Sequence, residues 1–147
     1  MKTVDIMLPY KLLVAHATPP KKSSNGAAGF DLRATDAATN HDEGYLEMGT
    51  GIAVAIPPGY VGKLYARSSI SNTPHFLRNH VGVIDSDYRG EIKFRFGILD
   101  NIHSPEYEVG DKIGQLVIEK IPDVQMFEVA ELPPTERGSG GFGSTGK

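Results

Sequence analysis

The sequence of 147 residues contains no cysteine. Disulfide bonds, thiolate nucleophiles and cysteine-based zinc sites are therefore excluded together. Positive charge is also scarce, because 15 Lys and Arg residues stand against 18 Asp and Glu residues and leave a formal net charge of -3. A general nucleic-acid-binding protein would carry a basic patch, so this balance argues against that class.

Long apolar runs are absent as well. The first 20 residues carry charges throughout and contain no apolar run that would serve as a signal peptide or a membrane span. We therefore expect a protein of a reducing, aqueous compartment, the cytoplasm or a nucleus, and no secretion. The composition that remains is typical of a soluble globular protein, and the chain length fits one domain.

Short segments with the two-residue alternation of β-strands follow one another along the chain. The clearest is 92–98, where Ile and Phe alternate with Lys93 and Arg95. Residues 40–47 are expected to form an acidic surface loop, and a single turn near 71–74 is the only helix expected. Further strands are expected within 4–14, from residue 30, and at 48–56, 60–66, 113–121 and 124–129. This pattern predicts an all-β barrel or sandwich.

The stretch 82–91 places two carboxylates, an aromatic ring and a guanidinium between two expected strands. In an extended backbone, Asp85 and Asp87 point to one side and Tyr88 to the other. We interpret the stretch as a hairpin whose tip can hold a carboxylate and an aromatic platform over a ligand. The alternative is a polar hairpin turn, in which Asp and Gly serve the backbone conformation alone.

Two further places offer groups that bind phosphate. Arg67, Ser68 and Ser69 follow an expected strand and supply a guanidinium, two hydroxyls and backbone amides. Such a triplet is more often an ordinary surface turn. Gln115 lies on an apolar strand and needs a hydrogen-bond partner, which is commonly an ordinary buried group.

The C-terminal tail is rich in glycine. Residues 141–147 match the first part of a phosphate-binding loop, but the Ser or Thr and the helix that this motif requires do not follow. We therefore divide the chain into a β-barrel domain at 1–136 and a flexible arm at 137–147. With a cation, hydroxyls and the Phe142 ring, the arm could close over a planar, phosphorylated ligand.

Taken in this order, the segments resemble the five motifs of the trimeric dUTPase family. The similar segments are 28–32, 66–69, 82–90, 110–116, and 137–138 with 141–146, and the third is the closest match. The resemblance implies a jelly-roll-like β-barrel with at most one short helix, assembling as a homotrimer whose subunits share the active sites. It implies Mg²⁺-assisted hydrolysis of dUTP to dUMP and pyrophosphate, which keeps uracil out of DNA and supplies dUMP for dTMP synthesis.

The resemblance also assigns roles by position. Asp85 would activate the water that attacks the α-phosphorus, because a carboxylate can accept the proton of that water. Tyr88 would pack against the deoxyribose. Asn79 and the backbone near Val83 and Ile84 would read the uracil edge, where polar pairing discriminates better than apolar fit.

The phosphates and the metal would be held by other segments. Phe142 of the arm would stack on the uracil, and Asp31 would act on metal-bound water or on Arg67. Mg²⁺ usually keeps several waters and sits on the phosphates, so no protein ligand is assigned to it. The residues expected to meet the phosphates are Arg67, Ser68, Ser69, Gln115, Arg137, Gly143, Ser144 and Thr145.

Two positions depart from the family pattern. Ser69 stands where Gly is usual, and its side chain can re-aim the phosphate-binding segment. Residues 112–114 read Lys-Ile-Gly where Arg-Ile-Ala is usual. Lys112 keeps the positive charge of Arg but loses its bidentate fork, which leaves the partner of this residue open.

Two alternative functions remain. The related dCTP deaminases share the fold and an Arg-Ser-Ser triplet, but they carry a catalytic glutamate on the strand where this chain has Lys93 and Arg95. They also lack the pattern found at 85–88. A non-catalytic jelly-roll binding module would be expected to have lost Asp85 or the arm with Phe142, and both are present.

Overall fold

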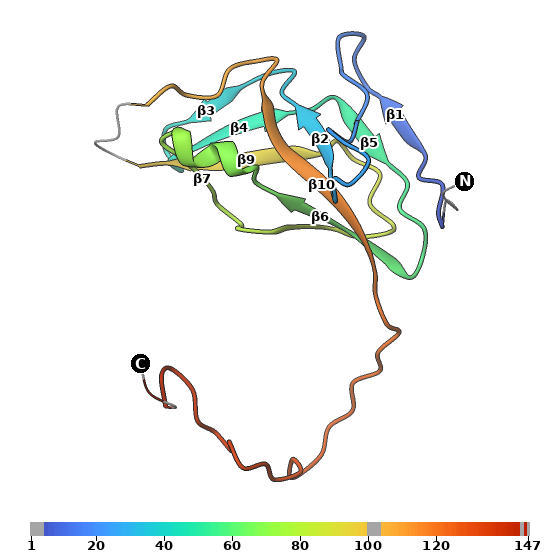
Figure 1. Cartoon of the computed structure of the whole chain (residues 1–147), viewed down its shortest axis with the longest axis vertical. Coiled ribbons are helices and arrows are strands. Elements are labelled where there is room, and N and C mark those ends of the chain that lie inside the picture. The colour runs from blue at the N-terminus through green and yellow to red at the C-terminus, as the bar shows by residue number, and fades with distance from the viewer. Residues whose placement is uncertain (1–4, 100–103, 145, 147) are drawn as a thin grey trace.

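The computed structural model describes residues 5–99, 104–144 and 146. Two four-stranded antiparallel sheets make up the body, with a two-stranded sheet beside them (Figure 1). The first sheet has the order β2 (Phe30–Arg33), β10 (Lys112–Lys120), β6 (Tyr60–Tyr65), β8 (Gly82–Ile84). The second has the order β3 (Ala38–Asn40), β4 (Tyr45–Gly49), β9 (Lys93–Ile98), β7 (His75–Leu77). The small sheet pairs β1 (Tyr10–Leu12) with β5 (Ile52–Val54).

The prediction of an all-β fold is confirmed. Over the described part of the chain the helical structure is η1 (Ser68–Asn72), a 3₁₀ helix. It begins three residues before the turn expected at 71–74 and overlaps it only at residues 71 and 72. No helix within that part is long and apolar enough to cross a membrane. The chain therefore carries its site on strands and on the connections between them.

The core lies between the two large sheets, because each presents an apolar face to the other. On β9, Phe94 and Phe96 are buried while Lys93 and Arg95 are exposed, which confirms the alternation predicted there. The first sheet contributes buried leucines, among them Leu116 of β10. Burial of these large side chains is the main favourable contribution to folding.

The single strand expected at 48–56 is wrong, because the structure has two strands there in different sheets. β4 ends at Gly49 and β5 begins at Ile52. Between them Gly51 has a φ of +64°, a conformation that L side chains rarely adopt. The Thr50 hydroxyl donates to the Ile92 carbonyl over 2.7 Å and fixes this break. The acidic loop expected at 40–47 is likewise a hairpin, formed by β3 and β4.

The interpretation of 82–91 as a hairpin is also wrong. β8 pairs with β6 in the first sheet, whereas β9 pairs with β4 and β7 in the second. The stretch therefore crosses from one sheet to the other. Alternation in the sequence shows which side chains face inward, but it does not show which strand is the neighbour.

The last expected strand, 124–129, is not formed. From residue 121 the chain leaves the body as an extended segment, 121–136, that leads to the arm (Figure 1). Its apolar side chains are exposed, including Met126 at 92% and Phe127 at 81%. A strand needs a hydrogen-bonded neighbour, and this segment of the isolated chain has none among the described residues.

Gly114 on β10 supplies the first test of the packing. A methyl group there would collide with the ring of Phe94 and would lie 3.0 Å from the Tyr65 carbonyl oxygen. Gly114→Ala is therefore expected to lower the free energy of unfolding by about 1–3 kcal/mol. Gly26→Ala is the control, because nothing lies within 4 Å of its added methyl.

The measurement is urea unfolding of both variants and of Gly114→Ala combined with Phe94→Leu. The smaller side chain at 94 should recover part of the loss caused by the methyl at 114. Equal unfolding midpoints for Gly114→Ala and Gly26→Ala would contradict the close contact with Phe94.

Candidate active site

Strand register brings the predicted phosphate-binding residues together. β10 lies between β2 and β6, and Gln115 stands opposite both Asp31 and Tyr65. Arg67, two residues past the end of β6, places its Nε 3.0 Å from Asp31 Oδ1. Lys112 places its Nζ 3.0 Å from Asp31 Oδ2. We call these four residues, Asp31, Arg67, Lys112 and Gln115, the Asp31 cluster.

Asp31 is held in the charged form by its neighbours. Its side chain is 11% exposed, and burial alone would raise its pKa. Hydrogen bonds from the Ser23 hydroxyl and from Lys112, together with the charges of Arg67 and Lys112, outweigh burial and lower the pKa below its ordinary value. Two cations around one carboxylate leave an excess positive charge, which suits a phosphate ligand.

Residues 67–71, which we call the phosphate loop, continue from this cluster. The Ile70 amide donates to the Arg67 carbonyl over 3.0 Å, and the Ser71 hydroxyl donates to the Ser68 carbonyl over 2.8 Å. Ser68 is exposed and Ser69 is half-buried. Arg67 donates to Asp31 through Nε. Its two terminal nitrogens make no hydrogen bond to the described part of the chain. They remain available to a ligand.

Gln115 supports the backbone that leads into this loop. Its side-chain amide donates to the Ala66 carbonyl over 3.2 Å, the kind of partner that a polar residue on an apolar strand requires. Its Oε1 occupies the space beside Gly29, where an added methyl carbon would lie 2.6 Å from it. Gln115 therefore already has a structural role before any ligand is considered.

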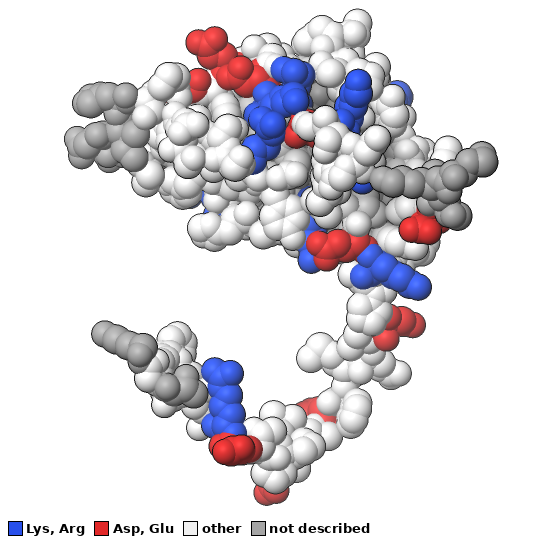
Figure 2. Space-filling model, in the orientation of Figure 1, with Lys and Arg blue, Asp and Glu red and all other residues white. Residues whose placement is uncertain are grey.

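Lys and Arg side chains gather over β2 and β10 on one face of the body (Figure 2). A pocket of about 550 Å³ on this part of the surface is lined by Lys21, Lys22, Arg33 and Lys112 together with Ser23 and Asp31. The sequence reading left the partner of Lys112 open, and the structure shows that this partner is Asp31. Ser23 was missed, because only its place in a polar loop distinguished it in the sequence.

The predicted base- and sugar-binding residues form a second group. Asn79, Val83, Ile84 and Tyr88 line a pocket of about 680 Å³, and Asp85 follows directly after Ile84 and is exposed. The outer face of the second sheet supplies the rest of the lining, which includes Tyr45, Glu47, Lys93 and Arg95. The sequence analysis did not predict that these charged side chains line the pocket, although it placed Lys93 and Arg95 on the outer face of β9.

Local hydrogen bonds fix the backbone around Asp85. The Tyr88 hydroxyl donates to the Glu91 carbonyl over 2.9 Å, and the ring of Tyr88 lies against Gly90. Arg89 Nη1 donates to the Ser86 carbonyl over 2.6 Å. The stretch is therefore a preformed platform even though it is not a hairpin.

Asp85 and the phosphate loop lie toward opposite ends of β6. Ile84 pairs with Gly62, and Leu64 pairs with Gly82, so Asp85 lies beyond Gly62 on the side away from the phosphate loop. Arg67 is five residues past Gly62. At about 3.3 Å per strand residue, the backbones of Asp85 and Arg67 are about 16 Å or more apart. Within one chain, the strand β6 thus holds the backbones of Asp85 and Arg67 well apart.

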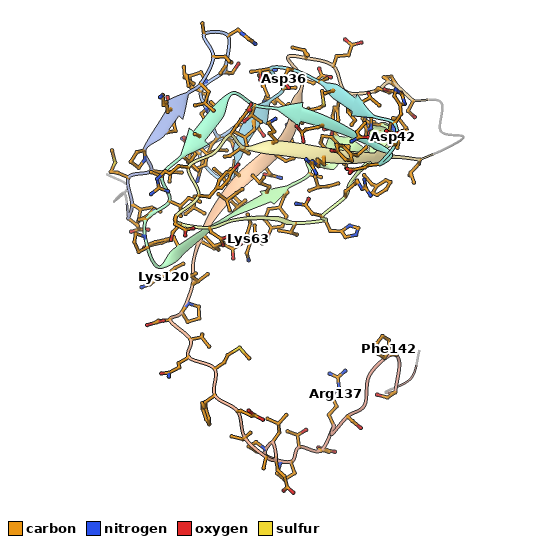
Figure 3. All side chains as sticks on the ribbon, turned by 180° about the vertical axis from the view of Figure 1, so that it is seen from behind. Asp36, Asp42, Lys63, Lys120, Arg137 and Phe142 are labelled. Atoms are coloured by element: carbon orange, nitrogen blue, oxygen red, sulfur yellow. The ribbon has the colours of Figure 1, made fainter. Side chains whose placement is uncertain are left out.

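The predicted arm residues meet neither group. Arg137 and Phe142 lie on the arm away from the body (Figure 3), and the Phe142 side chain is fully exposed. Arg137 Nε donates to the Gly140 carbonyl, and the Ser144 amide donates to the Gly141 carbonyl, each over 3.0 Å. Gly143 has a φ of +87°. Thr145 lies outside the described residues.

No protein cage for a metal ion is found within the described ranges. No group of three or more His, Asp or Glu side chains there could hold one. The carboxylate of Asp31 is already engaged by two cations and a hydroxyl.

The chain is similar to known proteins over nearly its whole length. The family model described as dUTPase matches residues 15–146. The deoxyuridine 5'-triphosphate nucleotidohydrolase of Paramecium bursaria Chlorella virus 1 is 41% identical over 138 residues, which is 92% of this chain and 95% of that protein.

Two solved structures extend the similarity to the fold. A variant of the dUTPase of Staphylococcus bacteriophage 80alpha, with dUpNHpp, has a TM-score of 0.78 at 28% identity and covers 96% of this chain and 99% of its own. A variant dUTPase from phage phi11 of S. aureus, in which a structural Mg(II) ion is coordinated, has a TM-score of 0.71 at 25% identity and covers 86% and 98%.

The charge of Asp31 provides a test of the cluster. Asp31→Asn is expected to lower the free energy of unfolding at pH 7 by about 1–3 kcal/mol, because an amide cannot balance two cations. The contribution of the carboxylate is complete above its ordinary pKa of about 3.9 and is lost as the pH falls through its lowered pKa in the folded chain. The difference from wild type should therefore shrink between about pH 5 and pH 2.

Thermal unfolding midpoints recorded across this pH range measure the difference. Asp42→Asn, which changes an exposed carboxylate in the β3–β4 turn, is the matched control. A loss of stability in Asp31→Asn that stays constant down to the lowest pH would show that shape, and not charge, matters at this position.

Proposed function

Because the chain belongs to the dUTPase family, we propose that it hydrolyses dUTP to dUMP and pyrophosphate at sites shared between the subunits of a homotrimer. The observation that carries the proposal is the presence of both halves of such a site in one chain, each preformed. The Asp31 cluster with the phosphate loop provides one half. The stretch 82–91, with Asn79, provides the other.

The separation of the two halves supports sharing between subunits. Asp85 and Arg67 of one chain are held about 16 Å or more apart by β6, so a second subunit must bring the complementary half. The segment 121–136, which leads to the arm, supports the same arrangement. Its exposed apolar side chains, such as Met126 and Phe127, are unfavourable in water and would be covered by crossing to a neighbour.

Asp85 is proposed as the general base of the reaction. It accepts a proton from water, and the water oxygen forms a bond to the α-phosphorus. The bond between the α-phosphorus and the oxygen that bridges to the β-phosphorus breaks, and pyrophosphate leaves with the bonding electron pair. The α-phosphate with the new oxygen stays on the nucleoside as dUMP.

Tyr88 and Asn79 are proposed to select the nucleoside. The Tyr88 hydroxyl is already bonded to the Glu91 carbonyl, so its ring is held in place to pack on the deoxyribose and exclude a 2′-hydroxyl. Asn79 and the backbone of Val83 and Ile84 line the same pocket and can pair with the uracil edge. Buried polar groups left unpaired by a wrong base make such a pocket selective.

The phosphate chain is proposed to lie on the phosphate loop of a neighbouring subunit. The terminal nitrogens of Arg67 and the amides and hydroxyls of Ser68 and Ser69 would bind it, and Gln115 supports the loop from behind. The arm would close over the nucleotide, with Phe142 on the base. The arm residues proposed to meet the phosphates are Arg137, Gly143, Ser144 and Thr145.

Mg²⁺ is proposed as the metal, held by phosphate oxygens and water. When bound, it neutralises charge on the triphosphate. Asp31 remains with Arg67 and Lys112, and its contacts keep the guanidinium aimed at the ligand. The donor set of the described residues fits this arrangement, because Arg67 and Lys112 offer positive charge to the phosphates that would hold the ion.

The reaction is tested by pyrophosphate release from dUTP, dCTP, dTTP and UTP with Mg²⁺. Wild type should act on dUTP alone. Asp85→Asn should lower kcat by at least about 100-fold, because a general base is lost, while KM changes little. Asp87→Asn, two residues further along the same stretch, is the control and should keep most of the activity.

Other outcomes point to other functions. Ammonia release from dCTP would assign the chain to the deaminases. No turnover of any of the four nucleotides by an intact trimer would leave a binding module.

Sharing of the sites is tested by mixing two inactive variants. Asp85→Asn and Arg67→Gln homotrimers should each be nearly inactive. After unfolding and refolding of a 1:1 mixture, about one quarter of shared sites would combine a wild-type Asp85 with a wild-type Arg67 from another chain. Activity should therefore return to about one quarter of the wild-type value. A mixture that stays as inactive as its components would place each site within one subunit.

A further inference from the structure

The connection between β7 and β8 is short and crosses from the second sheet to the first. Only residues 78–81 lie between the two strands. The Arg78 amide donates to the Arg95 carbonyl over 3.0 Å, and Arg78 Nη1 donates to the Glu43 carbonyl over 2.8 Å. The beginning of the connection is therefore fixed on the second sheet, and the chain has to reverse sharply to enter the first.

Two successive turns make this reversal. The His80 amide donates to the Leu77 carbonyl over 3.1 Å, which closes a β-turn. The Val81 amide then donates to the Asn79 carbonyl over 2.5 Å, and this hydrogen bond closes a three-residue turn with His80 at its centre. His80 has a φ of +55°. A three-residue turn with a positive central φ is the rare and strained form of the γ-turn.

The backbone of His80 needs a physical reason to remain in this conformation. Among the described residues other than glycine, a positive φ is found only at His80 and at Phe142 of the arm. Histidine tolerates it better than most residues, but such strain persists only where the surrounding structure imposes it, and it is commonest at functional sites. The His80 side chain is exposed, so burial of the ring does not compensate for the strain.

The side chain that the turn places is that of Asn79. A methyl carbon added to the buried Gly82 would lie 3.1 Å from Asn79 Nδ2 and 3.1 Å from Leu64 Cβ, so the amide of Asn79 lies directly over the start of β8. This amide makes no hydrogen bond to the described part of the chain. The lining of the 680 Å³ pocket includes Asn79 and does not include His80. The turn therefore aims an unpaired amide at the pocket.

We propose that His80 is a positioning residue for base selection, and that its γ-turn fixes the side-chain amide of Asn79 over Gly82. This proposal rests on the proposed function of the pocket in binding the uracil of dUTP. The conformation of the His80 backbone carries the role, and the imidazole does not contact the ligand. The turn also pairs the Asn79 carbonyl with the Val81 amide, so these two groups are withdrawn from the base and the side chain of Asn79 is left to meet it.

A fixed amide is what discrimination between uracil and cytosine requires. The amide of Asn carries a donor and an acceptor on one rotatable group. Uracil presents a carbonyl acceptor where cytosine presents an amino donor. An amide that rotates freely can satisfy either base, whereas an amide held in one orientation satisfies one base and leaves buried polar groups unpaired with the other.

The test compares three variants at position 80 by calorimetric titration with non-hydrolysable analogues of dUTP and dCTP. His80→Val introduces a β-branched residue that resists positive φ, and it should lower the preference for the dUTP analogue about three- to tenfold. Its KM for dUTP should rise by a similar factor, while kcat stays within about twofold. His80→Gly and His80→Asn accept positive φ without the imidazole and should keep the preference of wild type.

Two further changes serve as controls. His41→Val makes the same substitution at an exposed histidine of ordinary φ in the β3–β4 turn and should leave the preference unchanged. Asn79→Ala should lose the preference, and adding His80→Val to it should cause no further loss, because both act through one amide. A further loss in the double variant would overturn the proposal. A loss in His80→Gly and His80→Asn as large as in His80→Val would show that the imidazole binds the ligand, and would overturn it too.

Stability separates a positioning role from a purely structural one. A His80→Val protein that unfolds at a lower temperature but keeps the wild-type preference would overturn the proposal. Failure of the proposed function is distinguishable, because wild type itself would then release no pyrophosphate from dUTP. The titrations would still decide the role of His80: a wild type that binds both analogues equally overturns it, and a preference that is lost only in His80→Val and Asn79→Ala supports it.

Discussion

The register of β10 between β2 and β6 is the constraint on which the rest of the site depends. Because Gln115 stands opposite Asp31 on one side and Tyr65 on the other, the carboxylate, the start of the phosphate loop and Lys112 meet at one end of the sheet. A slip of one residue would turn every β10 side chain to the opposite face and dismantle the Asp31 cluster. The close fit of Gly114 against Phe94 opposes such a slip.

The same register explains what could be read from the sequence. Alternation along 92–98 showed which side chains face the core, because burial imposes a two-residue period on any half-buried strand. It could not show that β8 and β9 belong to different sheets, since alternation is the same for every partner. The division of 48–56 at Gly51 was hidden for a similar reason, because both halves are apolar and only the backbone conformation separates them.

The residues of the candidate site were also only partly predictable from the sequence. Motif residues such as Arg67, Asp85 and Gln115 were identifiable because their chemical types occur in a recognisable order. Their partners were not identifiable, because Ser23 lies in a loop with no distinguishing pattern and the contact of Lys112 with Asp31 spans most of the chain.

The exposed arm and the divided site have one physical origin. A body of this size uses its two sheets to enclose a core, and little of the chain remains to surround a nucleotide. Asp85 and the phosphate loop therefore lie toward opposite ends of β6, and the segment 121–136 carries apolar side chains that the body does not cover. In the proposed trimer, the contacts between subunits complete each active site and also cover the exposed apolar side chains. Folding, assembly and activity therefore become linked. The activity of such an enzyme depends on subunit concentration, because dissociation would expose the arm and separate Asp85 from the phosphates in one step.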